Sequence, residues 1–131
     1  ETVQKCLEVF APMIRTFTVC RENMRRAAQQ GFINATDLAD YLVKKGLPFR
    51  SAYKITGQIV AYCIREKKVL ETLSLEEYKT FSPLFENDLY EAIRLEACVD
   101  RRISEGGTSV ASVEKQIAQV MEFLKHDESI Y

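Results

Sequence analysis

The sequence predicts an all-α protein, in which one long bundle helix precedes a compact domain of about five helices arranged as helical hairpins. Apolar residues recur at steps of three and four along most of the chain, which is the spacing of one helix face. Glycine and proline mark the ends of these periodic segments. No segment shows the alternation of apolar and polar residues that is typical of a half-buried strand.

The composition is that of a single globular domain. The chain has 131 residues, of which 47% are hydrophobic and 28% charged. No apolar run approaches the roughly 20 residues that a membrane span needs, and the first residues lack the features of a signal peptide. A formal net charge of −1 gives no large field to attract nucleic acid or an acidic membrane. There is no initiator Met, so we expect a piece of a longer protein.

The first thirty residues predict one long helix with a narrow apolar seam, as in a helix bundle. The seam consists of Val3, Leu7, Phe10, Ile14, Phe17, Cys20 and Met24. Pro12 removes one backbone hydrogen bond and predicts a bend, and Gly31 ends the helix near Gln30. Since a bundle helix needs partners, we expect the seam to be covered by folding back or by self-association.

A helical hairpin is predicted next. Its first helix begins at Asn34 or Thr36, ends at Gly46 and cannot continue through Pro48. The residues expected to be buried in this helix are Leu38, Tyr41 and Leu42. The second helix runs from about 50 to 67, with an inward face of Tyr53, Ile55, Ile59, Val60, Cys63 and Ile64. Gly57 is unfavourable inside a helix and predicts the close approach of a neighbouring helix.

Three further helices complete the prediction. Ser74 and Glu77 form a capping-box sequence that starts a short helix ending before Pro83. Asn87 or Asp88 caps a helix over 89–102, which is buried along Leu89, Ile93, Leu95 and Val99. Gly106-Gly107 breaks the chain, and Thr108 or Ser109 opens the last helix. The apolar face of that helix consists of Val110, Val113, Ile117, Val120, Met121 and Leu124. Residues 126–131 lack periodicity, and we expect them to fray.

Candidate catalytic and metal-binding residues are few. The single histidine, His126, lies near the tail, and we expect it to be solvent-exposed rather than catalytic. The four cysteines, Cys6, Cys20, Cys63 and Cys98, lack the close spacing of a metal site. We expect four reduced thiols facing the core of a cytosolic protein.

Several charged and polar groups allow either a structural or a functional interpretation. The acidic pairs Glu76-Glu77 and Glu86–Asp88 are interpreted as helix-start residues rather than general acids or bases. Arg101 and Arg102 could bind a carboxylate, but we favour cations that complement the end of a helix. Thr108 and Ser109 are interpreted as caps. Gly106-Gly107 lacks the context of a dinucleotide site and is interpreted as a turn.

The hairpin also leaves a helix-turn-helix nucleic-acid module open as an alternative. The possible groove contacts are Arg50, Ser51, Lys54, Thr56 and Gln58. Lys44 and Lys45 complete a local basic cluster with Arg50 and Lys54. The net charge and the absence of a basic stripe elsewhere count against this alternative.

Three sequence blocks occur in a characteristic order. They are ATDLADYLVKKGLPFRSAY, then LSLEEYKTFSPLF, then LEACVDRRISEGGT with a following helix that contains EKQI. In this order and spacing they resemble the C-terminal domain of argininosuccinate lyase, over roughly residues 34–124. Residues 1–30 resemble the last long helix of that family's central bundle. The resemblance therefore divides the chain into a bundle helix, 1–30, and a C-terminal helical domain, 31–131.

The resemblance implies a function for the parent protein. Members of the family are cytoplasmic homotetramers of the fumarase and aspartase superfamily and need no metal or organic cofactor. They cleave argininosuccinate by β-elimination into arginine and fumarate, a step of arginine biosynthesis. Some relatives serve as lens crystallins with little or no activity, and the chain does not separate an active parent from an inactive one.

The chain departs from the family pattern at the catalytic segments. The signature loop with paired serines, Met-Pro and lysine is missing from these 131 residues, as is the active-site histidine segment. The resemblance therefore assigns no catalytic, cofactor-binding or metal-binding residue here. We expect a structural region of a carbon–nitrogen lyase that is inactive alone and binds neither nucleic acid nor membrane.

Overall fold

The computed structural model describes residues 1–127, and the side chains of residues 1–125. Every regular element in this part of the chain is helical, which confirms the predicted all-α fold. The α-helices are α1 (Thr2–Arg15), α2 (Arg21–Gln30), α3 (Ala35–Lys44), α4 (Phe49–Glu66), α5 (Leu75–Phe81), α6 (Leu89–Ile93), α7 (Leu95–Asp100) and α8 (Val110–Asp127). A short 3₁₀ helix, η1 (Leu70–Thr72), lies between α4 and α5.

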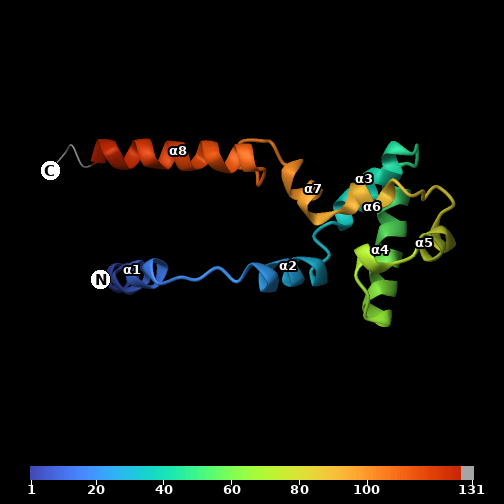
Figure 1. The fold of residues 1–131 in the computed structure, drawn as a ribbon, viewed down its shortest axis with the longest axis horizontal. Coiled ribbons are helices and arrows are strands. Elements are labelled where there is room, and N and C mark those ends of the chain that lie inside the picture. Colours follow the sequence, from blue (N-terminus) through green and yellow to red (C-terminus); the bar gives the residue numbers. More distant parts are fainter. Residues whose placement is uncertain (128–131) are drawn as a thin grey trace.

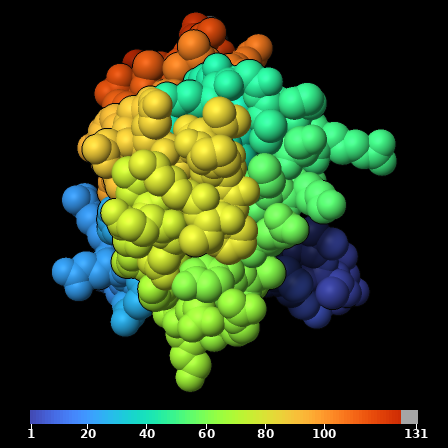
Figure 2. All heavy atoms as spheres, turned by 90° about the vertical axis from the view of Figure 1, so that its right-hand side faces the viewer, coloured from blue at the N-terminus to red at the C-terminus, as the bar shows by residue number. Residues whose placement is uncertain are grey.

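The molecule consists of a compact helical unit with two arms. Helices α3 to α7 cluster at one end, while α1–α2 and α8 extend from the cluster in the same direction (Figure 1). Viewed from the end of the cluster, the arms lie behind it, with α8 above and α1–α2 below (Figure 2). The N-terminal end of α1 and the C-terminal end of α8 therefore lie far from the compact unit (Figure 1).

The hydrophobic core lies within the compact unit. Helix α3 packs against α4 and α6, and α5 packs against α4. The largest fully buried apolar or aromatic side chains are Tyr78, Phe85, Leu38, Leu42, Ile59, Leu70, Leu73, Leu89 and Ile93. The hydroxyl of Tyr78 donates to the carbonyl of Leu70 at 2.7 Å, so this buried polar group is satisfied. The predicted burial of Leu38, Tyr41 and Leu42 is confirmed.

The prediction of a single long helix over residues 1–30 is wrong, because the structure has two helices there. Helix α1 continues through Pro12 and ends at Arg15, and α2 begins only at Arg21. The intervening sequence TFTV is rich in β-branched residues, which lose side-chain freedom in a helix. The Thr16 hydroxyl lies 3.3 and 3.2 Å from the carbonyls of Pro12 and Met13 and helps to close the last turn.

The helix predicted over 89–102 is also divided. Arg94 has the extended angles φ −57° and ψ 128°, which separate α6 from α7. The side chain of Asn34 donates to the carbonyl of Ile93 at 2.8 Å. The Arg101 guanidinium donates to the carbonyl of Ala92. Since both donors lie outside α6, local sequence could not reveal this break.

Several burial predictions need correction. In α4, Tyr53 and Ile64 are exposed, whereas Ile59 and Cys63 are buried as expected. Of the four cysteines, Cys6 and Cys20 are exposed: Cys6 lies on α1, which has no buried residue, and Cys20 lies just before α2. Val99 is also exposed. The predicted apolar face of α8 is exposed throughout: Val110, Val113, Ile117, Val120, Met121 and Leu124.

Most of the residues predicted to start or stop a helix do so in the structure. The Ser74 hydroxyl accepts from the Glu77 amide at 3.2 Å, and the Glu77 carboxylate accepts from the Ser74 amide at 2.9 Å. Gly46 has φ +95°, the left-handed conformation that favours glycine after a helix. Ser109 accepts from the Ser112 amide at 3.2 Å and caps α8. Within residues 1–127, no helix has the length and apolarity required to cross a membrane.

Leu42→Ala tests the location of the core. Leu42 is fully buried, so we expect the free energy of unfolding to fall by about 2–5 kcal/mol. The control is Val43→Ala, because Val43 is exposed on the same helix and should change the free energy by less than about 1 kcal/mol. Urea unfolding followed by circular dichroism measures both. Equal effects of the two substitutions would contradict the assigned core.

Candidate functional site

A buried carboxylate, Asp37, joins the start of α3 to two arginines at the end of α7. Asp37 is 5% exposed and accepts two parallel hydrogen bonds from Arg102, of 3.0 and 2.9 Å. Arg101 approaches the same carboxylate at 3.7 Å. The interpretation of Arg101 and Arg102 as cations that complement a helix end is confirmed in part, because they donate to the carbonyls of Ala97 and Cys98 near the end of α7. Arg102 does bind a carboxylate in bidentate fashion, but the carboxylate belongs to its own chain.

Arg101 has a second structural role. Its Nε donates to the carbonyl of Ala97 at 2.9 Å, and a terminal nitrogen donates to the carbonyl of Ala92. These carbonyls lie on either side of the break at Arg94. Arg101 thus bonds one carbonyl at the end of α6, where the helix is interrupted, and one carbonyl near the end of α7. Asn34, expected as a capping side chain for α3, makes no cap bond and bonds Ile93 instead.

The electrostatics of this junction favour a charged Asp37 and a neutral thiol beside it. Burial disfavours the charged carboxylate, but the hydrogen bonds and charges of Arg102 and Arg101 outweigh it and lower the pKa of Asp37. Burial, together with the neighbouring Asp37, raises the pKa of Cys98 to about 12. A thiol with this pKa is protonated at neutral pH and is therefore a poor nucleophile.

The acidic run before α6 forms a second ion-paired contact with α3. Lys45 Nζ lies 2.6 Å from Glu86 and 3.0 Å from Asp88. The Tyr41 hydroxyl donates to Asp88 and accepts from the Glu86 amide at 3.2 Å. Asp88 occupies the N-cap position of α6 but makes no cap hydrogen bond. The run therefore ties α6 to α3, and its predicted capping role is wrong.

Glu77 is fully engaged in structural bonds. It completes the capping box and also accepts from Lys68 Nζ at 2.6 Å and from the Tyr62 hydroxyl at 2.7 Å. The hydrogen bond from Lys68, followed by those from Ser74 and Tyr62, lowers the pKa of Glu77 to about 2. A carboxylate so easily ionised is a weak base, and its interpretation as a helix-start residue is confirmed.

The turn between α7 and α8 is fixed by backbone geometry. Gly106 has φ +74°, and a Cβ on Gly107 would lie 2.1 Å from the carbonyl oxygen of Arg102. The Thr108 hydroxyl donates to the carbonyl of Val99 at 3.2 Å. The positive φ of Gly106 and the close approach at Gly107 require glycine at both positions. This turn leads the chain into α8, in agreement with the prediction.

The residues of the helix-turn-helix alternative do not form one accessible set. Arg50, Ser51, Lys54 and Gln58 are exposed along α4, but Thr56 is buried. Lys45 is neutralised by Glu86 and Asp88. The structure thus weakens the basic cluster and removes one of the proposed groove contacts.

Metal-binding side chains do not converge in the part of the chain that is described. Groups of three or more His, Cys, Asp or Glu side chains able to hold a metal are not found there. The side chain of His126 lies outside the described residues, as does the end of the predicted frayed tail.

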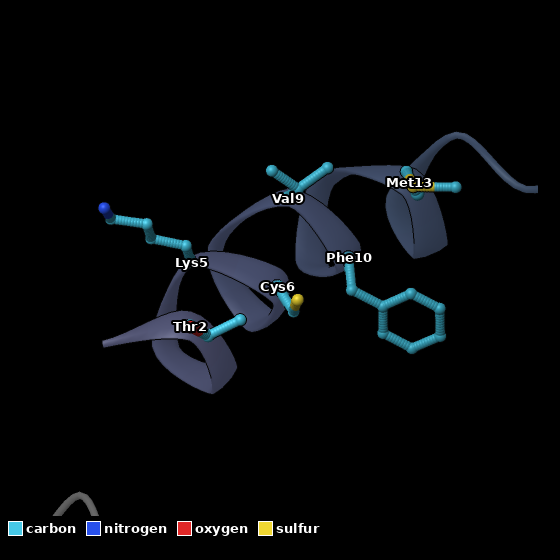
Figure 3. A pocket seen from close by; sticks show the side chains of 6 residues that line it. All are labelled: Thr2, Lys5, Cys6, Val9, Phe10 and Met13. Atoms are coloured by element: carbon cyan, nitrogen blue, oxygen red, sulfur yellow. The ribbon is translucent and has the colours of Figure 1, made fainter.

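The arms carry many of the large apolar side chains that are exposed in the described part of the chain. Phe10, Ile14 and Phe17 are 54%, 55% and 68% exposed, so the predicted folding back of the seam does not occur within the described residues. A shallow hollow of about 480 Å³ on this arm is lined by α1 alone, from Thr2 to Met13. Its side chains project outward from one helix rather than enclosing a cavity (Figure 3). Such a surface is typical of protein interfaces.

Comparison with known proteins identifies relatives along nearly the whole chain. A family model described as "Argininosuccinate lyase C-terminal" matches residues 32–100. The chain is 52% identical to an argininosuccinate lyase from Desulforamulus reducens, over 95% of this chain and 27% of the relative. It is 54% identical to one from Caldicellulosiruptor bescii, again over 95% of this chain and 27% of the relative. The chain thus spans about a quarter of the length of these relatives.

A solved structure shares the fold. It is a variant of EDDS lyase with bound fumarate, at a TM-score of 0.72 and 26% identity. The similarity covers 82% of this chain and 24% of that one.

Asp37→Asn tests the junction. We expect the free energy of unfolding at neutral pH to fall by about 1–3 kcal/mol, because the guanidinium of Arg102 loses its carboxylate. Arg102 is 41% exposed, so solvent screening favours the lower part of this range. Urea unfolding measures the loss. The exposed Asp40 on the same helix provides the control substitution Asp40→Asn.

The pH dependence of the same variant gives a second readout. The folded-state pKa of Asp37 is lowered, so its contribution is fully present above the unfolded-state pKa of about 4. That contribution is lost as the pH falls from there through the folded-state pKa. The unfolding free energies of the native chain and Asp37→Asn should therefore converge in acid. A difference that stays constant with pH would contradict this account.

Proposed function

Because the chain belongs to the argininosuccinate lyase family, as its C-terminal region, we propose that it is the packing domain of an enzyme that cleaves argininosuccinate into arginine and fumarate. The observation that supports this proposal is the match to the family's C-terminal region together with about 50% identity to argininosuccinate lyases along almost the whole chain. The reaction is a β-elimination, which needs a base beside the departing proton and cationic or amide donors for the carboxylates.

The catalytic groups of this reaction are proposed to lie outside the chain. Support comes from the state of the candidate groups within it. Arg102, the best placed carboxylate binder, is occupied by Asp37, and Glu77 is occupied by Lys68 and Tyr62. The substrate site is accordingly assembled from the longer part of the enzyme, and this chain contributes no catalytic, cofactor-binding or metal-binding residue.

The proposed role of residues 1–30 is to extend a helical bundle, and that of residues 31–131 is to close its end. The exposed seam of α1 supports the first role, since such a seam requires neighbouring helices. The compact core of α3 to α6 supports the second. The intact enzyme is proposed to be a cytoplasmic homotetramer that takes part in arginine biosynthesis.

A chimera tests the proposed function. In the Desulforamulus reducens enzyme, the segment matched by this chain is replaced by the chain itself. We expect fumarate release from argininosuccinate to stay within about tenfold of the unmodified enzyme, since the replaced part does no chemistry. Ultraviolet absorbance of fumarate provides the measurement.

Two controls accompany the chimera. The same enzyme truncated before this segment should lose activity, and the isolated chain should release no fumarate. The proposal fails if the chimera assembles like the unmodified enzyme but cannot cleave argininosuccinate. It fails equally if the isolated chain turns over substrate.

A further inference from the structure

Helices α3 and α4 form a shallow apolar groove of about 530 Å³ that no other element of the described chain fills. Its floor is made of small residues, Ala35 and Ala39 on α3 and Gly57 on α4. Phe49 and Tyr53 line one side with rings 6.1 Å apart, and they are 60% and 68% exposed. Two large aromatic side chains so exposed beside a hollow are typical of an interface.

Gly57 provides the geometric argument for a helix as the occupant. Glycine is unfavourable within a helix, and here its φ is ordinary, so the backbone conformation does not require it. A Cβ built on Gly57 would meet nothing within 4 Å, so packing within the described chain does not require it either. A missing side chain at a groove floor allows another backbone to approach closely, as small residues do between packed helices.

Charge distinguishes the two rims of the groove. Arg50 and Lys54 are one helical turn apart, and each is three residues from a groove residue, Tyr53 or Gly57. Both cations are exposed, and neither forms an ion pair with the described part of the chain. The α3 side carries one charge of each sign, Asp40 and Lys44, and has no net preference.

We propose that the α3–α4 groove docks an amphipathic helix that has a narrow apolar stripe and acidic residues along the edge facing α4. The stripe covers Phe49, Tyr53 and the small-residue floor. The acidic edge pairs with Arg50 and Lys54. This site is separate from the α1 seam, and it does not depend on the activity of the parent enzyme.

A protein helix fits this surface better than nucleic acid does. The groove is apolar at its floor, whereas phosphate contacts need a continuous basic surface. Lys45 is already paired with Glu86 and Asp88, which leaves Arg50 and Lys54 as a short basic rim. Duplex DNA is therefore an outcome that the test must exclude.

The test uses two synthetic helix-forming peptides of about five turns. One has a leucine and alanine stripe with glutamates along one edge, and the other has lysines in their place. Each is titrated into the isotope-labelled 131-residue chain, and amide chemical shifts are recorded. We expect the glutamate peptide to shift Tyr53, Gly57 and Val60 saturably and to bind about tenfold more tightly than the lysine peptide.

Variants of the chain make the test specific. Arg50→Glu with Lys54→Glu should reverse the preference, so that the lysine peptide binds more tightly. Gly57→Leu should block both peptides while leaving the fold intact, because a Cβ at this position meets nothing within 4 Å and leucine favours the helix. Lys115→Glu on the distant α8 is the matched charge control and should leave both affinities unchanged.

Several outcomes would overturn the proposal. They are equal binding of the two peptides, shifts confined to α1 or α8, and retained binding by folded Gly57→Leu. Self-association of the chain through the groove would instead identify a second copy as the occupant and reject the acidic helix. Saturable shifts of the same amides by duplex DNA, with no response to the glutamate peptide, would also reject it.

Discussion

The bidentate contact between Asp37 and Arg102 is the interaction on which the arrangement of the chain depends most. It joins the first turn of α3 to the end of α7 across 65 positions of sequence. The carbonyl of Arg102 lies so close to Gly107 that only glycine fits there. Through this turn, the ion pair sets where α8 leaves the compact unit. Arg101 and Asn34 complete the junction by bonding carbonyls at the break between α6 and α7.

The arms that leave this junction have apolar faces that the described part of the chain leaves exposed. Helix α1 has no buried residue, and the apolar face of α8 is exposed. Arg25 of α2 bonds Glu96 at 3.0 Å, so the arm is attached to the compact unit by polar contacts rather than by its apolar seam. The chain spans about a quarter of the length of its argininosuccinate lyase relatives, and we propose that the longer enzyme covers these faces. In a region that serves packing, we expect charged groups to pair within the chain and apolar faces to remain available for other helices.

Features with a local cause could be predicted from sequence. The capping box at Ser74, the glycine stop at Gly46 and the cap at Ser109 each depend on residues within one turn. The family was also recognised from three short blocks, and the comparisons confirm it. What failed depends on distant contacts or on missing ones. The break at Arg94 is stabilised by Asn34 and Arg101. The Arg102 guanidinium binds the carboxylate of Asp37, which lies on another helix.

Exposure was the hardest property to predict. Tyr53 and Ile64 follow the helical period of buried residues, yet they face away from this chain's core. Periodicity marks a face that will be covered but does not say which molecule covers it. The predicted burial of Cys6 and Cys20 was wrong for the same reason. An apolar seam has the same sequence pattern whether it packs on its own core or on another molecule.

The central claim is that this chain is a packing region whose apolar arms require helical partners. Analytical ultracentrifugation of the 131-residue chain over a range of concentrations, with helicity followed by circular dichroism, tests it most directly. The account predicts concentration-dependent association that Phe10→Glu weakens, because Phe10 lies in the exposed seam. A strict monomer with α1 fully helical at every concentration would contradict it.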